Sequence, residues 1–473
     1  MIKGRSIPAS SVENGGRPMR DLFFVAFLGA MLLLGMRRPF LLVLGYVYVD
    51  IVSPQHLSYY LLNSVPISLL FFVGAVGGWL MFDRKQAFSF SPRQGAMLLL
   101  LVYCYFSTQN ADFPLEATEK WDWVWKVLVF AIFLPLTITS RLRFEALATT
   151  LMLSASSIII AAGIKTAASG GGYGVLNLMS DSNTGLYESS TLACVAISLI
   201  PFILYLRRNS TIFPPDWRVS LFCGALCFAC LLIPVGTEAR TGLICIAALG
   251  VMMLRAAKRP FLYIFAAAFL GLATIPFLPE SFTKRMDTMN EVQADESAST
   301  RLAVWRWTIE YAGLHPLGGG FDSYRGNSFR YEAKTSSKFD PNAPAAHEPG
   351  STIVIVDEGR AFHSAYFEML GEQGWPGLCI WLFIHLSGLL RMEILFRRYK
   401  SRAPEDGHWI AGLATALQQA NIIYLIGAAF IGVAFLSFAY MLIALQIALD
   451  AYARRFDRER TRKPFFTAKV VPA

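Results

Sequence analysis

The sequence predicts an all-α polytopic membrane protein, because three observations agree. Of the 473 residues, 55% are hydrophobic and only 16% are charged, whereas about a quarter of the residues in a soluble domain are charged. Apolar runs long enough to cross a bilayer recur along almost the whole chain. These runs lack the short alternating segments of a membrane β-barrel. Because a backbone in lipid must satisfy its own hydrogen bonds, we expect the runs to be helices, about 12 in total.

The apolar runs can be placed in order along the chain. The runs that we expect to span the membrane are Val65–Phe82, Ala96–Ser107, Trp121–Ile138, Leu147–Ala162, Leu186–Leu206, Leu221–Val235, Leu243–Leu254, Phe261–Leu278 and Leu378–Phe396. A further run, Trp409–Leu449, is long enough for two helices. Near the N-terminus, Leu22–Met36 and Phe40–Val52 are short runs separated by Arg37, Arg38 and Pro39.

Basic residues gather in short loops that alternate along the chain, and by the positive-inside rule these loops face the cytoplasm. The net charge of +9 is therefore attributed to membrane topology and not to nucleic-acid binding. The long segment Pro279–Phe362 then lies on the opposite, outer side. At the N-terminus the rule conflicts with itself, since Arg20 and Arg38 stand on either side of a single run.

The chain is expected to form one membrane domain with a single large extramembrane segment. We expect residues 1–18 to be a disordered extension, with Met19 as an alternative start, and residues 454–473 to be a basic cytoplasmic tail. Transmembrane helices then occupy residues 19–278 and 363–453, and residues 279–362 form the outer loop. The seven cysteines all lie in apolar runs and are interpreted as packing residues, because no flanking histidine supports zinc.

Two polar sites lie at the ends of the outer loop, where membrane helices should begin. The first is Arg301–Gly320, in which Arg301–Ala312 is predicted to be an amphipathic helix at the membrane–water boundary. The second is His363–Gly377, whose glycines and proline predict a break between two helical pieces. Ionisable groups in such places are costly unless they line a wet or ligand-filled cavity. The pair therefore predicts an active site at a membrane surface.

Three arginines belong to this outer face. Arg240 precedes the run Leu243–Leu254, Arg301 opens the predicted boundary helix, and Arg306 follows about one turn later. Taken singly, each is explained by contact with lipid headgroups. A guanidinium group is also permanently charged and binds phosphate oxygens in a bidentate way. Arginines that converge from separate segments would hold a lipid diphosphate and stabilise it as a leaving group.

His363 begins a helix that carries Tyr366, Glu368 and Glu372. A single histidine at a membrane boundary is commonly a polar surface group, but its ordinary pKa also suits removal of a proton from a hydroxyl near neutral pH. Glu368 and Glu372 are four residues apart and share a helix face. Such a pair suggests a divalent metal, although no third acidic ligand is near in sequence, so we expect these carboxylates to orient neighbours or pair with arginines. Arg306, Tyr366, Glu368 and Glu372 are the expected substrate-binding residues, and no metal or cofactor is expected.

The order of these motifs resembles the O-antigen ligase/polymerase superfamily. The motifs are Arg301-x3-Trp305, His315-Pro316-Leu317-Gly318-Gly319-Gly320, and His363-Ser364-Ala365-Tyr366-Phe367-Glu368-x2-Gly371-Glu372-x-Gly374. At the N-terminus, Met19-Arg20-Asp21-Leu22, Arg38-Pro39 and Pro54-Gln55-His56 resemble a subgroup, the O-glycosylation ligases associated with exosortase A systems. The resemblance covers the chain from Met19 to about Ala453.

This resemblance implies a GT-C-like membrane fold and metal-independent transfer of a glycan from undecaprenyl diphosphate on the periplasmic face of the bacterial inner membrane. The acceptor hydroxyl would lie on lipid A core, on another glycan or on a protein. By motif position, Arg240 and Arg301 would contact the diphosphate and His363 would be the base.

Two alternatives stay open on the sequence alone. One is a polymerase of O-antigen or exopolysaccharide, which would use the same donor and the same site. The other is a transporter of lipid-linked glycans. The nearly uncharged runs and the gathering of polar groups on one side favour surface chemistry over transport, since transporters place charged residues at the membrane midplane.

Overall fold

The computed structural model describes most of the chain but not all of it. The described residues are 17–58, 61–62, 65–83, 85, 90–169, 185–254, 259, 261, 296–334 and 352–461. The expected N-terminal extension up to residue 16, almost all of the expected span Phe261–Leu278 and the end of the basic tail lie outside these ranges. The first part of the outer loop, up to residue 295, and its residues 335–351 lie outside them as well.

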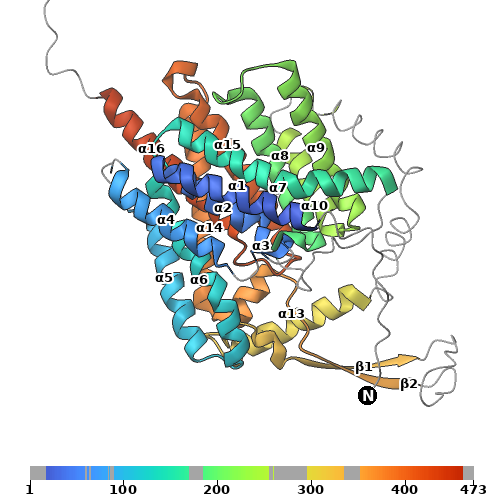
Figure 1. The fold of residues 1–473 in the computed structure, drawn as a ribbon. Coiled ribbons are helices and arrows are strands. Elements are labelled where there is room, and N and C mark those ends of the chain that lie inside the picture. Colours follow the sequence, from blue (N-terminus) through green and yellow to red (C-terminus); the bar gives the residue numbers. More distant parts are fainter. Residues whose placement is uncertain are drawn as a thin grey trace, which may run out of the picture.

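Helices make up nearly all of the described structure (Figure 1). In the first half they are α1 (Arg17–Arg37), α2 (Phe40–Val52), α3 (Pro54–Leu57), α4 (Ile67–Phe82), α5 (Pro92–Gln109), α6 (Pro114–Thr137), α7 (Arg141–Ser169), η1 (Gly185–Tyr187), α8 (Ser189–Asn209), α9 (Trp217–Gly236) and α10 (Arg240–Leu254). In the second half they are α13 (Glu296–Leu314), η4 (Ser323–Gly326), α14 (Ala365–Tyr399), η5 (Pro404–Asp406), α15 (His408–Ala428) and α16 (Ser437–Thr461).

The predicted membrane character is confirmed in its general form. Within the described ranges, six helices are long and apolar enough to cross a membrane, namely α1, α7, α8, α9, α14 and α15, and α2, α4 and α10 are shorter apolar helices. The expected number of about 12 spans stays a prediction. Helix α16 is not among the helices that are long and apolar enough to cross a membrane, and it ends in the charged sequence Arg454–Thr461.

Several breaks that the sequence predicted are present. Arg38 and Pro39 separate α1 from α2, because proline cannot continue the hydrogen-bonded ladder of a helix. The run Trp409–Leu449 forms two helices, α15 and α16, on either side of residues 429–436. Gly374 interrupts α14 with backbone angles φ 62° and ψ −166°, which only glycine adopts readily.

A two-stranded antiparallel hairpin was not expected in an all-α protein. Strands β1 (Ser328–Lys334) and β2 (Thr352–Glu358) pair in a register that joins Ser328 to Glu358 and Lys334 to Thr352. In the sequence, Ile353–Val356 is a short β-like run, and it lies within β2. Its partner strand carries Arg330, Glu332 and Lys334 in alternation with other residues, so hydrophobicity alone does not reveal it.

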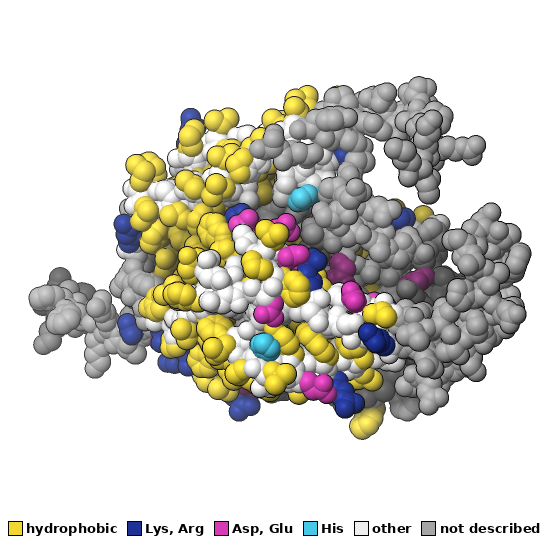
Figure 2. Space-filling model, turned by 90° about the horizontal axis from the view of Figure 1, so that it is seen from below, with side chains coloured by type: hydrophobic (Ala, Val, Ile, Leu, Met, Phe, Trp, Pro, Cys, Tyr) yellow, Lys and Arg dark blue, Asp and Glu magenta, His cyan; other side chains and the backbone are white. Residues whose placement is uncertain are grey.

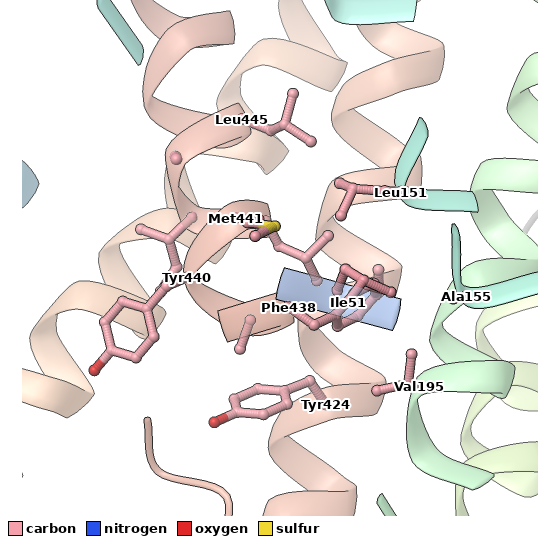
Figure 3. Packing of buried hydrophobic residues seen from close by; sticks show 14 of the residues in the cluster. Ile51, Leu151, Ala155, Val195, Tyr424, Phe438, Tyr440, Met441 and Leu445 are labelled. Carbon is pink, nitrogen blue, oxygen red and sulfur yellow. The ribbon is translucent and has the colours of Figure 1, made fainter. Parts of the chain in front are cut away.

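The core is formed where helices from both halves of the chain pack together. Helix α15 packs against α8 and α14, and α16 packs against α6. In Figure 3, Ile51 of α2, Leu151 of α7 and Val195 of α8 gather around Phe438 and Tyr424, which come from α16 and α15 and are buried.

Helix α13 and the hairpin lie together at one end of the molecule (Figure 1). Seen from that end, acidic, basic and histidine side chains stand among hydrophobic ones (Figure 2). Helix α13 is longer than the predicted Arg301–Ala312, and it buries Val304, Thr308 and Ala312 while Leu302 and Ile309 point outward. Its large apolar side chains are therefore free to face a membrane surface.

Candidate active site

The two polar sites predicted from the sequence meet through their backbones. The N–H of Gly319 donates to the carbonyl of Gly371 (3.0 Å), that of Gly320 to the carbonyl of Glu372 (2.9 Å), and that of Trp375 to the carbonyl of Pro316 (3.0 Å). These bonds join the loop after α13 to the break within α14. We name this junction the glycine contact, formed by residues 316–320 and 371–375.

Glycine is required at the glycine contact for two physical reasons. Gly318 and Gly374 both have positive φ, at 85° and 62°, which side chains disfavour. A Cβ atom on Gly374 would also lie 2.3 Å from the carbonyl oxygen of Pro316, and one on Gly318 would lie 2.5 Å from that of Glu372. The two segments can approach this closely only because no side chains separate them.

Beside the glycine contact, one lysine holds both carboxylates of α14. The Nζ atom of Lys120, on α6, lies 2.7 Å from Oε1 of Glu368 and 2.7 Å from Oε1 of Glu372. The side chain of Lys120 is 14% exposed, and those of Glu368 and Glu372 are 8% and 0% exposed. Of the two roles expected for these carboxylates, orienting neighbours or pairing with arginines, the contact with Lys120 fits the first, and their cationic partner is a lysine from another helix.

The same carboxylates also accept backbone hydrogen bonds. Oε1 of Glu372 accepts from the N–H of Asp322 (3.0 Å), and Oε2 of Glu368 accepts from the N–H of Ala434 (3.0 Å). Oε2 of Glu372 is buried and has no hydrogen-bond partner among the described residues. The cluster of Lys120, Glu368 and Glu372 thus ties α6, α14 and the segments at 322 and 434 together, next to the break in α14.

Trp305 connects α13 to the segment that carries His363. Its indole N–H donates to the carbonyl of Phe362 (2.9 Å), and its ring stacks on Phe367 with centroids 4.9 Å apart and planes 10° apart. The backbone of His363 has φ 48°, which is uncommon for a residue other than glycine. The tryptophan therefore fixes the backbone immediately before His363 relative to the helix that carries Arg301.

Arg301 acts electrostatically on His363. Partial desolvation lowers the pKa of His363 below its ordinary value of 6.5, and the positive charges of Arg301 and Arg360 lower this pKa further. Arg301 also acts on Glu188, just before α8: burial raises the pKa of Glu188, whereas Arg301 opposes that rise. At neutral pH the imidazole of His363 is consequently uncharged and able to accept a proton.

Arg360 is held in place at the end of the hairpin. The side chain of Asn327 accepts from the N–H of Arg360 (2.9 Å) and donates to its carbonyl (2.7 Å), and the guanidinium of Arg360 pairs with Asp357. Asn327 directly precedes β1 and Asp357 lies in β2. The hairpin therefore carries a positive charge toward the segment of His363.

The other predicted site residues lie in different settings. Arg240 opens α10, which packs against α8 and α15. Arg306 is 84% exposed and pairs with Glu310 along the same helix (3.1 Å). The hydroxyl of Tyr366 donates to the carbonyl of Leu425 in α15 (3.0 Å), so this side chain faces the bundle. Of the predicted set, the structure brings Arg301 close to His363 and places Glu368 and Glu372 together on Lys120.

A metal site does not arise from these carboxylates in the described part of the chain, where no group of three or more His, Cys, Asp or Glu side chains is arranged to hold a metal ion. The ammonium group of Lys120 occupies the position between Glu368 and Glu372 that a cation would take.

Sequence reasoning missed Lys120 and Trp305 as members of the site. Lys120 directly precedes the predicted span Trp121–Ile138, and basic residues are rare on the outer side, so an acid pair on that side could have pointed to it. Trp305 enters the sequence analysis only as a position of the motif Arg301-x3-Trp305. Nothing in its spacing indicates that its N–H reaches Phe362, since 57 residues separate the two.

Two family models match parts of the chain. Residues 19–211 match the model of a family of unknown function (DUF5935). Residues 225–382 match the family model of the O-antigen ligases, and Arg240, Arg301 and His363 all lie within the matched segment. No curated protein matches the chain. The ligase-family match and the apolar helices together support a multi-pass membrane glycosyltransferase of the ligase or polymerase kind, in the O-antigen ligase superfamily.

Proposed function

We propose that this protein transfers a glycan from undecaprenyl diphosphate to an acceptor hydroxyl at the periplasmic face of the bacterial inner membrane. The observation that carries the proposal is that α13 docks onto the segment of His363 through Trp305, so that the charge of Arg301, on the same helix, acts on His363. A permanent positive charge beside an uncharged imidazole is the pair of groups that this reaction needs.

In the proposed mechanism Arg301 binds the diphosphate, together with Arg240 from the start of α10. Two guanidinium groups match the oxygens of a diphosphate and stabilise the negative charge that develops as it leaves. Before the donor binds, Glu188 offers Arg301 a negative charge of its own. Donor binding therefore exchanges one anionic partner of Arg301 for another, and desolvation of an unpaired arginine is avoided.

His363 is the proposed base. As the acceptor oxygen forms its bond to the anomeric carbon, the bond from that carbon to the diphosphate oxygen breaks and the hydroxyl proton passes to the imidazole. The lowered pKa keeps His363 uncharged, and therefore competent, at neutral pH. The diphosphate leaves with its electron pair, so the step balances without a nucleotide or a metal.

The geometry changes the roles proposed for the remaining predicted residues. We assign Glu368 and Glu372 to holding α14 in place through Lys120, because both carboxylates are already engaged. Arg306 remains a candidate for contact with lipid or with an extended donor, since its side chain is exposed. Tyr366 supports the helix through Leu425.

The proposal also includes three expectations about topology and family subgroup. They are a total of about 12 spans, basic loops in the cytoplasm, and membership of the subgroup associated with exosortase A systems. A neighbouring exosortase gene and a polysaccharide cluster would support the subgroup, whereas a lipopolysaccharide core cluster would favour lipid A core as acceptor.

The test is glycan transfer by the purified protein in EDTA. We expect His363→Ala to abolish transfer while His315→Ala, at an exposed histidine stacked on Tyr311 in the same region, keeps it. Full activity in His363→Ala would remove the base assignment.

The arginine role needs a geometric variant. Arg301→Lys keeps the charge but loses the bidentate fork, so transfer should fall strongly, whereas Arg397→Lys, at an exposed arginine paired with Glu393, should stay near wild type. Wild-type activity in Arg301→Lys would remove the bidentate contact from the mechanism.

A polymerase of O-antigen or exopolysaccharide is the second candidate, because the superfamily that the motifs resemble includes both reactions. The two are separated by the glycans of a deletion strain. Single units that remain attached without long chains indicate a polymerase, and long chains that remain unattached indicate a ligase.

A further inference from the structure

A cavity of about 80 Å³ lies at the other end of the bundle, between α4, α5, α6 and α16. Helix α5 starts beside the cavity and ends near the glycine contact. Just after the helix, the N–H of Asp112 donates to the carbonyl of Gly319. The 18 residues of α5 span about 27 Å, so the cavity is a separate site from the one described above. A water molecule occupies about 30 Å³ in the liquid, so the space is large enough for more than one.

The walls of the cavity carry four basic side chains and a single acidic one. The basic residues are Lys85, Arg454, Arg455 and Arg458, and the acidic residue is Asp450. Asp450 is already shared, because Arg391 pairs with one of its oxygens and Arg454 lies 2.7 Å from the other. The buried Arg93, in the first turn of α5, lies within electrostatic range of the same carboxylate.

Two of the cavity's cations have no anionic group bonded to them in the described structure. The Nη2 atom of Arg455 is buried and makes no hydrogen bond there, and its guanidinium lies 6.0 Å from the ring centroid of Tyr452. Lys85 has only the ring of Trp79, at 5.7 Å, as a partner in the same part of the chain. The charge of Glu459 acts on Arg455, but a buried guanidinium nitrogen without an acceptor is unfavourable, so the cavity suits a bound anion.

The positive-inside rule explains why cations gather at this end of the helices but not why they line a cavity. Trp79, Pro135, Leu136 and Ile447 supply an apolar wall beside the cations, while Ser91 and Gln94 supply hydrogen-bonding groups. A phosphate group next to glycerol and acyl chains matches this division into a charged and an apolar side.

We propose that this cavity binds the phosphate group of an anionic phospholipid from the adjacent leaflet. Arg455 and Lys85 would contact the phosphate oxygens, and the apolar wall would contact the start of the acyl chains. The lipid would join α4, α5, α6 and α16, and it takes no part in glycan transfer.

The test compares retention of phosphatidylglycerol and phosphatidylcholine by native mass spectrometry of the full-length protein from mixed nanodiscs. The preference for phosphatidylglycerol over phosphatidylcholine should be about 25-fold weaker in the Lys85→Gln/Arg455→Gln variant than in the wild type. Each cation near a membrane surface contributes about fivefold, and the variant lacks two. The control Arg218→Gln/Arg397→Gln removes the same charge from sites outside the cavity and should stay within about twofold of wild type.

Equal retention by the two double variants would overturn the proposal, since net charge alone would then set the preference. Displacement of phosphatidylglycerol by inorganic phosphate would overturn the lipid assignment in favour of a free anion. If the double variant does not fold, the single Lys85→Gln variant, at an exposed position, should still lose about fivefold.

Discussion

Replacement of Lys120 by methionine gives the most direct test of the charged cluster beside the break in α14. Methionine has a similar length and no charge. The change leaves Glu368 and Glu372, which lie on one helix face and are nearly or fully buried, without the ammonium that is 2.7 Å from each. Breaking a buried ion pair by removing one partner costs about 3–5 kcal/mol, because an uncompensated charge stays buried.

The matched control is Lys126→Met on the same helix. Lys126 has an aromatic contact with Trp125 at 5.7 Å, and we expect its replacement to change stability by no more than about 0.5 kcal/mol. The double variant Lys120→Met/Glu372→Gln removes one of the two stranded carboxylates and should recover about 1–3 kcal/mol of the loss.

The assay is unfolding of the purified protein in detergent, followed through thermal and denaturant transitions, with glycan transfer measured on the same samples. Transfer should fall together with stability in Lys120→Met, because the cluster adjoins the segment that places His363. A Lys120→Met variant as stable as Lys126→Met would refute the assignment of this cluster as a support for α14.

Three further predictions follow from the same geometry. Arg360→Gln removes a positive charge that lowers the pKa of His363. Since the uncharged imidazole is the proposed base, activity is lost as the pH falls through this pKa, so the acidic limb of the pH–rate profile should lie below pH 6.5 in the wild type and move to higher pH in the variant. An acidic limb that does not move would contradict either His363 as the base or the effect of Arg360 on its pKa. Gly374→Ala should destabilise the protein by at least about 2 kcal/mol, because Gly374 has a positive φ and the new Cβ would lie 2.3 Å from a carbonyl oxygen. The control Gly313→Ala in α13, where no atom lies within 4 Å of the new Cβ, should be neutral or stabilising by up to about 1 kcal/mol in the same unfolding assay. Trp305→Phe keeps an aromatic ring but loses the hydrogen bond to the carbonyl before His363, so steady-state transfer kinetics should show kcat falling more than KM, and an unchanged kcat would argue against a positioning role.

The sequence predicts the helices well because apolar runs are long and are ended by strong signals. The division at Arg38 and Pro39, the two helices in Trp409–Leu449 and the break at Gly374 all follow from local chemistry that is visible in one sequence. The hairpin was missed because its strands pair across residues 335–351 and its first strand carries charged residues at alternate positions.

Several residues of the candidate site could be proposed from the sequence, but Lys120 and the contacts could not. Arg301 and His363 stood out because ionisable groups are rare in this chain. The pairing of Glu368 and Glu372 with Lys120 joins residues about 250 positions apart, and no periodicity encodes such a separation. Arg306 is five residues from Arg301 in α13, which places the two about 140° apart around the helix axis.

The glycine contact has a consequence for how this site can diversify. Because peptide groups join residues 316–320 to residues 371–375, the spacing between α13 and α14 does not depend on the size of any side chain at the junction. Side chains around the site can then change to suit a different glycan or acceptor while the separation of the two segments that carry Arg301 and His363 is preserved. The junction fixes the distance between the segments of the two residues proposed for catalysis, and its own residues are the ones least free to vary.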